Sequence, residues 1–337
     1  MTFRNPATRA GFRETPAARP GPLLRDGPPA GAVRVPFSSV ELPDIVVTPE
    51  WLLGRLGSEL RPPDGLVIAD VRWKPGASVR DAFVQGHLPG AVSIDVDVDL
   101  ARPAFDGPGR HPLPSPEAFA HAMGSAGIGD EDLVVVYDDA GGSVAARLWW
   151  MLHVTGHRAA LLDLPSLETW TAIGGAWDTG AGSPSPEPAS FGARPWPRER
   201  IADADDVRAS LIRGTGIVVD ARAGERYRGE VEPIDPVAGH IPGAVSAAWI
   251  GNRDPQTERL LAPAALRSRY AELGVRDGAS TIASCGSGVT ACLAVLTMER
   301  AGLPGARLYE GSWSDWTHDP SRPFATGVEP GTMQTSR

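Results

Sequence analysis

The sequence is poor in cysteine, lysine and long apolar runs, and each scarcity excludes a class of protein. Its 337 residues hold two cysteines, Cys285 and Cys292, too few for a disulfide framework and typical of a reducing, cytoplasmic setting. Lys74 is the only lysine among 32 basic residues, and 41 acidic residues bring the formal net charge to −9. This charge argues against a nucleic-acid-binding protein, whose mark is a basic face.

Membrane spans and bound cofactors are not expected either. No apolar run reaches the roughly 18 residues that a membrane span needs. The spacing of the two cysteines matches no zinc motif and no further Cys or His lies near them, so we expect neither a metal nor an organic cofactor. Residues 1–43 are rich in Arg, Pro and Gly and lack the apolar segment of a secretory signal, which predicts a disordered N-terminal tail.

The chain contains the same pattern of segments twice. An apolar run at 66–70 ends in Asp and is followed by Gly-His-Leu-Pro-Gly-Ala at 86–91. A second run at 216–220 ends in the same way and is followed by Gly-His-Ile-Pro-Gly-Ala at 239–244. Because the offset between matching segments is nearly constant, we interpret the two halves as a duplicated domain.

A proline-rich stretch separates the two copies. Proline removes a backbone donor and favours extended chain, so residues 179–198 are expected to form a semi-rigid linker. The domains are then expected at 44–178 and 199–325, with a C-terminal tail at 326–337. Within each domain short apolar strands alternate with helices, which predicts an α/β fold with a parallel sheet flanked by helices.

Cys285 has the setting of a reactive cysteine. It ends an apolar strand and is followed by Gly286-Ser287-Gly288 and then by a helical stretch. The glycines let backbone N–H groups turn inward into an anion-binding nest, and the start of the helix adds a partial positive charge. Both effects favour the thiolate, which is the form that attacks, and both suit a persulfide anion. Cys292 lies among apolar helical neighbours and is expected to be a packed, inert thiol.

Two other kinds of loop are built from similar parts, and the residues exclude both. A P-loop needs a lysine after its last glycine, and the 285–290 loop has none. A cysteine phosphatase needs an arginine at a fixed distance after the cysteine to clamp phosphate, and Ala291 stands there. A phosphate group would therefore lack its clamp.

The tandem domains, the two Gly-His-x-Pro-Gly-Ala motifs and the Cys-Gly-Ser-Gly-Val-Thr loop resemble the rhodanese superfamily over about residues 44–325. Within that superfamily the loop is most similar to that of the 3-mercaptopyruvate sulfurtransferases. The resemblance implies a sulfurtransferase that carries sulfur as a persulfide on Cys285. It also implies that the first domain is inactive, because Asp138 stands where the second copy has Cys285.

The resemblance assigns roles to further residues. Ser287 would hydrogen-bond the thiol or carbonyl group of the donor, and His87 would relay a proton through Ser287 as a general base and then a general acid. Arg226 aligns with the family arginine that binds the substrate anion. The remaining loop residues are expected to line the substrate site: Gly286, Gly288, Val289 and Thr290.

Two of these residues also have structural alternatives. The Gly-His motif marks a turn, so packing and turn geometry alone explain His240 and equally suit His87. The hydroxyl of Ser287 is also able to bond its own loop backbone.

The donor and acceptor define the alternatives for function. Gly286-Ser287 favours 3-mercaptopyruvate, because thiosulfate enzymes of the family typically carry basic residues after the cysteine. Ile234 stands where the family often has a second arginine, so a thiosulfate:cyanide sulfurtransferase is the first alternative. A non-catalytic rhodanese-like binding or regulatory protein is the second, and the intact Cys285 loop argues against it. The expected acceptor is cyanide, a small thiol or a thioredoxin-like protein.

Overall fold

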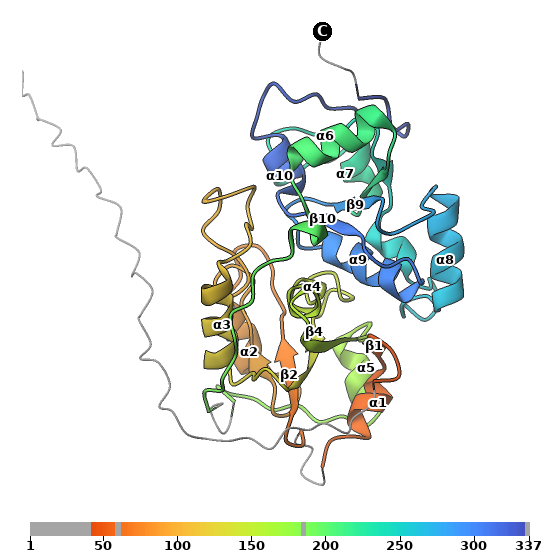
Figure 1. The fold of residues 1–337 in the computed structure, drawn as a ribbon. Helices are drawn as coiled ribbons and strands as arrows, with labels where there is room; N and C mark the ends of the chain where they lie inside the picture. The colour runs from red at the N-terminus through yellow and green to blue at the C-terminus, as the bar shows by residue number, and fades with distance from the viewer. Residues whose placement is uncertain (1–41, 58–61, 183–186, 334–337) are drawn as a thin grey trace, which may run out of the picture.

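Two parallel sheets with the same strand order make up the computed structural model, which describes residues 42–57, 62–182 and 187–333 (Figure 1). The strands of the first sheet follow the order β1-β5-β4-β2-β3, and those of the second follow β6-β10-β9-β7-β8. Neighbouring strands are parallel in both sheets. The repeated order confirms the predicted α/β fold with two copies of one domain.

Short strands alternate with helices in both domains. The elements of the first domain are β1 (Val46–Val47), α1 (Pro49–Leu53), β2 (Leu66–Asp70), α2 (Val79–Gln85), β3 (Val92–Ser93), α3 (Pro116–Ser125), β4 (Leu133–Tyr137), α4 (Ala146–Val154), β5 (Arg158–Leu162) and α5 (Leu167–Ala172). Those of the second are η1 (Arg198–Arg200), β6 (Ile201–Ala202), α6 (Ala204–Arg213), β7 (Ile217–Asp220), α7 (Gly224–Arg228), β8 (Val245–Ser246), η2 (Trp249–Asn252), α8 (Pro263–Glu272), β9 (Thr281–Ser284), α9 (Ala291–Arg300), β10 (Arg307–Tyr309) and α10 (Ser312–Trp316).

The central strands end together in each sheet, which fixes where the loops begin. In the first sheet Asp70 of β2 is paired with Tyr137 of β4. In the second sheet Asp220 of β7 is paired with Ser284 of β9. Because the strands are parallel, the loop after β4 and the loop after β9 each leave the carboxyl edge of a sheet, where α/β proteins bind ligands.

One hydrophobic core spans both domains. Helix α4 of the first domain packs against α9 of the second, at the centre of Figure 1. Leu148 of α4 and Leu293 and Leu296 of α9 are fully buried in this core. Burial of each such leucine contributes about 1.5–3 kcal/mol to stability. The shared core therefore fixes the separation between the loop after β4 and the loop after β9. Smaller cores lie under α1, α2 and α5 in the first domain and under α6 and α10 in the second.

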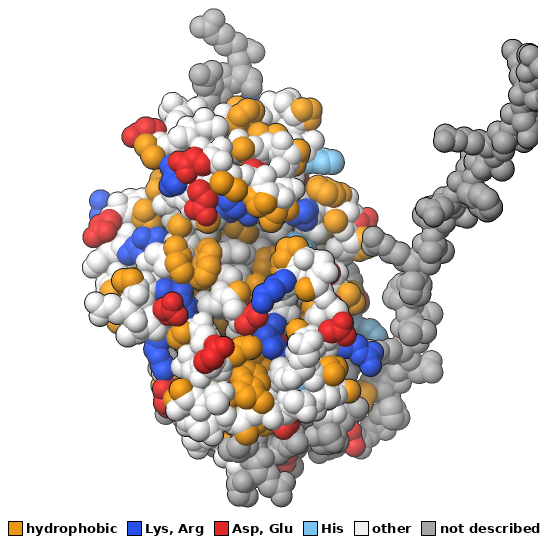
Figure 2. All heavy atoms as spheres, turned by 180° about the vertical axis from the view of Figure 1, so that it is seen from behind, with side chains coloured by type: hydrophobic (Ala, Val, Ile, Leu, Met, Phe, Trp, Pro, Cys, Tyr) orange, Lys and Arg blue, Asp and Glu red, His pale blue; other side chains and the backbone are white. Residues whose placement is uncertain are grey.

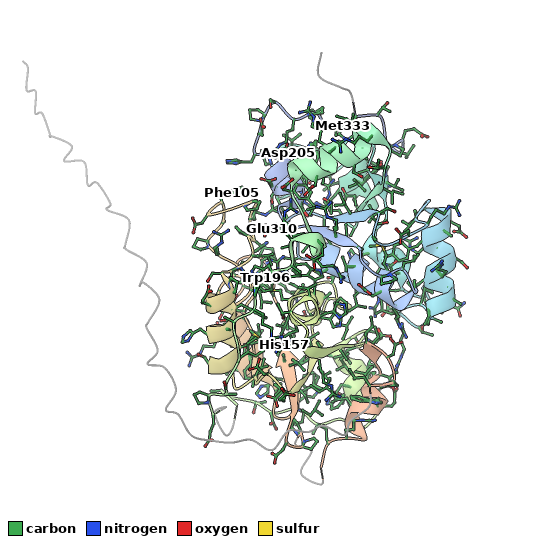
Figure 3. All side chains as sticks on the ribbon, viewed as in Figure 1. Phe105, His157, Trp196, Asp205, Glu310 and Met333 are labelled. Carbon is green, nitrogen blue, oxygen red and sulfur yellow. The ribbon has the colours of Figure 1, made fainter. Side chains whose placement is uncertain are left out.

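The described part of the proline-rich stretch lies against the first domain. Ala189 N–H donates to the Gly124 carbonyl at 2.9 Å, and Trp196 Nε1 donates to the Pro114 carbonyl at 2.7 Å. Trp196 lies near the junction of the two domains (Figure 3). These hydrogen bonds hold the described part of the stretch against the first domain.

The described part of the C-terminal segment also contacts a domain. Gly243 N–H donates to the Pro330 carbonyl at 2.6 Å, and Met333 packs against the core of the second domain. The predicted N-terminal tail falls, up to residue 41, outside the described residues.

Charge is dispersed over the surface. On the face shown in Figure 2, Lys and Arg side chains are scattered among Asp and Glu side chains. In the part of the chain that the structure describes, no helix is long and apolar enough to cross a membrane.

Because one core spans both domains, we expect a destabilising substitution in one domain to lower the stability of the other. Leu148→Ala is expected to lower the free energy of unfolding by about 2–5 kcal/mol, because it leaves a cavity in the shared core. Amide hydrogen exchange measured by mass spectrometry should then increase in β9 of the second domain.

Leu52→Ala is the matched control, because Leu52 is also fully buried but lies in the core under α1. Its effect on exchange should stay within the first domain. If Leu148→Ala also leaves the amide hydrogen exchange of β9 unchanged, the two domains are energetically independent.

Candidate active site

Cys285 lies at the carboxyl end of β9, buried under the start of α10. Only 2% of the residue is exposed. Its backbone N–H donates to Ser312 Oγ at 3.0 Å, and the same hydroxyl lies 3.9 Å from Cys285 Sγ. The carbonyl oxygen of Cys285 accepts from Trp313 N–H at 3.0 Å, and that of Gly286 accepts from Ser314 N–H at 2.9 Å. These bonds fix the peptide planes around the thiol.

The turn of the 285–290 loop requires glycine at position 288. Gly288 has φ +77°, which a residue with a side chain adopts only at a cost. A Cβ atom there would also collide with the carbonyl oxygen of Glu310. The loop is therefore in close contact with the segment that connects β10 to α10.

The corresponding loop of the first domain holds a carboxylate in place of the thiol. Asp138 stands where the second copy has Cys285, and it is 1% exposed. Its oxygens accept four backbone N–H bonds of 2.7–2.8 Å, from Ala140, Gly142, Val144 and Ala145. Burial raises the pKa of Asp138, while these N–H bonds act in the opposite direction. The first copy thus shows that a loop of this kind encloses an acidic group.

The hydroxyl of Ser287 contacts His111, which comes from the irregular segment between β3 and α3 of the first domain. His111 Nδ1 lies 2.7 Å from Ser287 Oγ, and His111 Nε2 lies 3.0 Å from Asp97 Oδ1. The hydrogen bond from His111 holds the pKa of Asp97 below its usual range, and Trp73 Nε1 donates to the same carboxylate at 2.8 Å. An ionised carboxylate only accepts, so in a neutral His111 ring Nε2 carries the proton and Nδ1 accepts from Ser287 Oγ.

The structure thus places His111 against Ser287, and not His87, for which the sequence predicts a proton relay. His87 Nδ1 donates to the Phe83 carbonyl at 2.9 Å, and its ring is stacked on Phe83 at 3.7 Å between centroids. His240 does the same in the second domain, with the Tyr227 carbonyl at 2.8 Å and the Tyr227 ring at 3.8 Å. These contacts of both histidines are the packing and turn contacts of the structural alternative.

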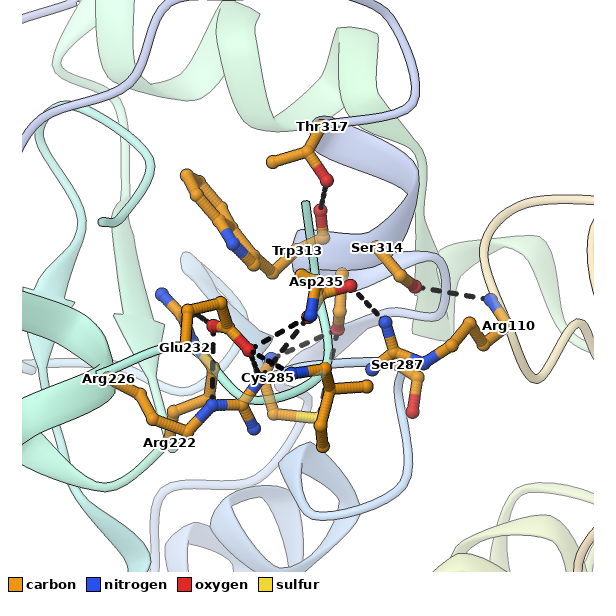
Figure 4. A network of polar contacts seen from close by, with 12 residues as sticks. Arg110, Arg222, Arg226, Glu232, Asp235, Cys285, Ser287, Trp313, Ser314 and Thr317 are labelled. Carbon is orange, nitrogen blue, oxygen red and sulfur yellow. Dashed lines mark hydrogen bonds and ion pairs between the residues drawn. The ribbon is translucent and has the colours of Figure 1, made fainter. Parts of the chain in front are cut away.

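Two arginines flank the loop from opposite domains. A Cβ atom on Gly286 would lie 3.3 Å from Arg110 Nη2 and 3.5 Å from Arg226 Nη1. Arg226 was predicted to bind the substrate anion, whereas Arg110, in the same segment as His111, was not. Figure 4 shows Arg110 reaching the loop from the first domain and Arg226 from the second. A second guanidinium group therefore lies beside the loop, contributed by the other domain, although Ile234 stands where the family often has an arginine.

The ion pairs of these arginines are made by other nitrogens. Arg110 Nη1 pairs with Asp235. Arg226 Nη2 lies 2.6 Å from Glu232 and 3.2 Å from Asp235. Burial raises the pKa of Asp235. Burial acts in the same direction on Glu232, but the hydrogen bond and charge of Arg226, together with the backbone N–H bonds from Asp235 and Ile234, outweigh it and lower the pKa of that carboxyl. The pairs hold both guanidinium groups in place while Arg110 Nη2 and Arg226 Nη1 face the loop.

The first-domain segment that carries Arg110 and His111 is fastened to the second domain. Gly109 approaches so closely that a Cβ atom there would lie 2.6 Å from Ser314 Oγ. Arg110 N–H donates to the same hydroxyl at 3.1 Å. Leu113 N–H donates to Glu310 Oε2 at 2.9 Å, and Glu310 lies where the two domains meet (Figure 3). Only the adjacent Arg-His pair at 110–111, in an otherwise Pro- and Gly-rich stretch, could have marked this segment in the sequence.

Two of the other predicted loop residues, Val289 and Thr290, lead from the loop into α9. The side chain of Val289 is buried in the shared core, so only its backbone is able to face a ligand. Thr290 occupies the N-cap of α9 and makes no side-chain capping bond. Within the described residues, no group of three or more His, Cys, Asp or Glu side chains is arranged to hold a metal ion.

Cys292 has an environment unlike that of Cys285. It is fully buried in α9, and its Sγ donates to the Gly288 carbonyl at 3.3 Å. Burial raises the pKa of the Cys292 thiol to about 12. At neutral pH this thiol is therefore protonated and unable to act as a nucleophile.

Comparison with known proteins identifies the family. The rhodanese-like domain matches residues 48–171 and 203–319. A Pseudomonas aeruginosa protein named as a 3-mercaptopyruvate sulfurtransferase is 42% identical over 279 residues, which cover 81% of this chain and 96% of the relative. Human 3-mercaptopyruvate sulfurtransferase is 34% identical over 83% of this chain and 94% of its own. A Mycobacterium tuberculosis protein named as a thiosulfate sulfurtransferase is 35% identical over 79% of this chain and 92% of its own.

Solved structures agree with this assignment. The crystal structure of SseA from Escherichia coli, described as a 3-mercaptopyruvate enzyme, has a TM-score of 0.67 at 30% identity and covers 80% of this chain and 99% of its own. The 3-mercaptopyruvate sulfurtransferase from Leishmania major has a TM-score of 0.70 at 26% identity and covers 83% and 75%. The chain belongs to the rhodanese family. It is a sulfurtransferase with two rhodanese-like domains, as the sequence predicts.

The different surroundings of the two thiols predict selective alkylation. In native protein at pH 8, iodoacetamide is expected to modify Cys285 and to leave Cys292 intact, because a thiol with a pKa of about 12 is almost wholly protonated there. Peptide mass mapping locates the adduct.

Denatured protein provides the control, since both thiols should then react. Equal labelling of Cys292 in the native protein would show that its burial does not protect it.

Proposed function

We propose that this protein moves sulfur from 3-mercaptopyruvate to a thiol or cyanide acceptor through a persulfide on Cys285. The observation that carries the proposal is the meeting of three components at one loop. These are the thiol of Cys285, a Ser287–His111–Asp97 chain of hydrogen bonds, and two arginines that face Gly286. Relatives named as 3-mercaptopyruvate sulfurtransferases support the choice of donor.

In the first half-reaction the Cys285 thiolate attacks the sulfur of 3-mercaptopyruvate. A sulfur–sulfur bond forms, the carbon–sulfur bond breaks, and its electron pair passes to the carbon chain as the enolate of pyruvate. The enolate takes up one proton and leaves as pyruvate. The sulfur remains on Cys285 as a persulfide, next to the N–H groups of the loop and the amino-terminal end of α9.

Ser287 and His111 would move the proton in this step. The donor sulfur carries a proton that must leave, and the methylene carbon of the enolate must gain one. With Nε2–H held by Asp97, Nδ1 of His111 accepts through the Ser287 hydroxyl and then returns the proton to carbon. Asp97 orients the ring and stabilises its charged form, as the carboxylate does in a Ser-His-Asp triad.

Arg110 and Arg226 would bind the carboxylate of the donor. Arginine suits a carboxylate because its planar fork donates two parallel hydrogen bonds. Position 286 then has to be small and uncharged, since a basic side chain there would lie against both guanidinium groups. This is the physical reason why the loop has glycine where thiosulfate enzymes of the family typically carry a basic residue.

In the second half-reaction an acceptor removes the outer sulfur and restores the thiolate. Cyanide, a small thiol or a thioredoxin-like protein has the required nucleophile. Such a two-step transfer predicts ping-pong kinetics. The two lone thiols of the chain support a reducing, cytoplasmic setting.

Thiosulfate is the second candidate donor. The Mycobacterium tuberculosis relative named as a thiosulfate sulfurtransferase favours it. The Cys285 loop and its two arginines would accept thiosulfate as a dianion, but the Ser287–His111 relay would have no proton to move.

The donor is tested by steady-state kinetics with both compounds and cyanide as the acceptor. We expect kcat/KM for 3-mercaptopyruvate to exceed that for thiosulfate by about 10²-fold or more, because the proton relay contributes only to the first. Cys285→Ser should be inactive with both donors. A preference for thiosulfate would overturn the proposed donor.

The relay is tested with His111→Gln. We expect kcat with 3-mercaptopyruvate to fall about 10²–10⁴-fold, with little effect on KM, because the variant keeps a polar side chain but loses the proton acceptor.

His87→Gln is the matched control. Because His87 packs on Phe83, this variant is expected to lower the melting temperature and to leave kcat of the folded protein unchanged. If His87→Gln lowers kcat and His111→Gln does not, the proton relay runs through His87.

A further inference from the structure

Arg147 of the first domain is fully buried beneath the 285–290 loop. It lies in the first turn of α4, the helix that packs on α9, and its exposed fraction is 0%. Arg147 Nη1 donates to the Gly288 carbonyl at 3.1 Å. Arg147 Nη2 donates to the carbonyls of His111 at 2.9 Å and Leu100 at 3.3 Å. One guanidinium group therefore joins the loop of Cys285 to the segment that carries the relay histidine.

The partners of Arg147 are carbonyl oxygens, which sets it apart from the other buried arginines of the described residues. Those three each contact an aspartate carboxylate, at 2.6 Å for Arg72, 2.7 Å for Arg222 and 3.4 Å for Arg253. Arg147 Nε, moreover, is buried without a hydrogen-bond partner. A buried cation without a carboxylate is costly, so its retention points to an anion that is present during function.

The Gly288 carbonyl links this cation to the loop that carries the reacting sulfur. It accepts from Arg147 Nη1 at 3.1 Å and from Cys292 Sγ at 3.3 Å, at the glycine whose φ of +77° turns the loop. The guanidinium group is also close enough to Cys292 to oppose the rise that burial causes in the pKa of that thiol. A sulfur anion on Cys285, in the same loop, would lie in the field of this charge.

We propose that Arg147 is a positioning residue for sulfur transfer, supplied by the domain that lacks the cysteine. Its guanidinium group fixes the position of the 285–290 loop relative to the backbone of His111, and its charge stabilises the anionic sulfur of Cys285. The inference rests on the proposed function for its role in turnover. Its effect on the resting thiolate does not depend on any donor.

The test compares Arg147→Met, Arg147→Lys and the wild type. The first readout is the rate of Cys285 alkylation by iodoacetamide as a function of pH, without a sulfur donor. Removing the charge in Arg147→Met is expected to move the midpoint of this profile upward by about one pH unit. Arg147→Lys keeps a charge, so its midpoint should stay close to that of the wild type.

The second readout is turnover of 3-mercaptopyruvate. A lysine cannot span three carbonyls as the planar guanidinium does, so Arg147→Lys should lower kcat by about tenfold or more and leave KM nearly unchanged. If Arg147→Met does not fold, the change in kcat without a change in KM in Arg147→Lys is the test of the positioning role. An unshifted alkylation profile in folded Arg147→Met, or an unchanged kcat in Arg147→Lys, would overturn the proposal.

Arg253→Met is the matched control. Arg253 is also buried, and its Nη1 donates at 2.6 Å to the Gly141 carbonyl in the corresponding loop of the first domain. This variant should lower stability and leave the alkylation profile of Cys285 unchanged. If the wild type takes no sulfur from 3-mercaptopyruvate while Arg147→Met still shifts the profile, the proposed function fails and the electrostatic role of Arg147 stands.

Discussion

The proposed sulfur anion at the end of β9 would have to be stabilised where water is largely excluded, and this constraint accounts for the arrangement of both domains. Cys285 is 2% exposed, so the compensating charge must come from the protein. Arg147 approaches the loop through the Gly288 carbonyl, and Arg110 and Arg226 face it at Gly286. Rigid packing around the loop keeps these cations in place before the donor arrives, which is the condition for electrostatic stabilisation of a transition state.

The first domain lacks the thiol but supplies side chains to the loop of the second. Its own loop encloses the Asp138 carboxylate in place of a thiol. Its irregular segment between β3 and α3 brings Arg110 and His111 to the other domain, and α4 brings Arg147. The shared core of α4 and α9 makes this cooperation possible, because it fixes the distance between groups that come from different domains.

Local patterns in the sequence predicted the fold, the duplication and the loop of Cys285. They predicted them because alternating apolar segments and a glycine-rich turn after a strand are local properties. His111 and Arg110 were missed because their importance depends on a contact between domains, which no spacing along the chain reveals. The sequence points to His87 instead because it lies in a recognisable motif, whereas the structure packs that histidine on Phe83. Arg147 sits in an apolar helical stretch, where the sequence does not show that its charge lacks a carboxylate.

The proposed mechanism depends on a persulfide at Cys285. We would measure the intact mass of the protein after exposure to one equivalent of 3-mercaptopyruvate and then map its peptides. We expect a gain of one sulfur atom, located at Cys285 and not at Cys292, absent from Cys285→Ser and released by cyanide. A wild-type protein that forms pyruvate without gaining sulfur, or that gains it at Cys292, would exclude this intermediate.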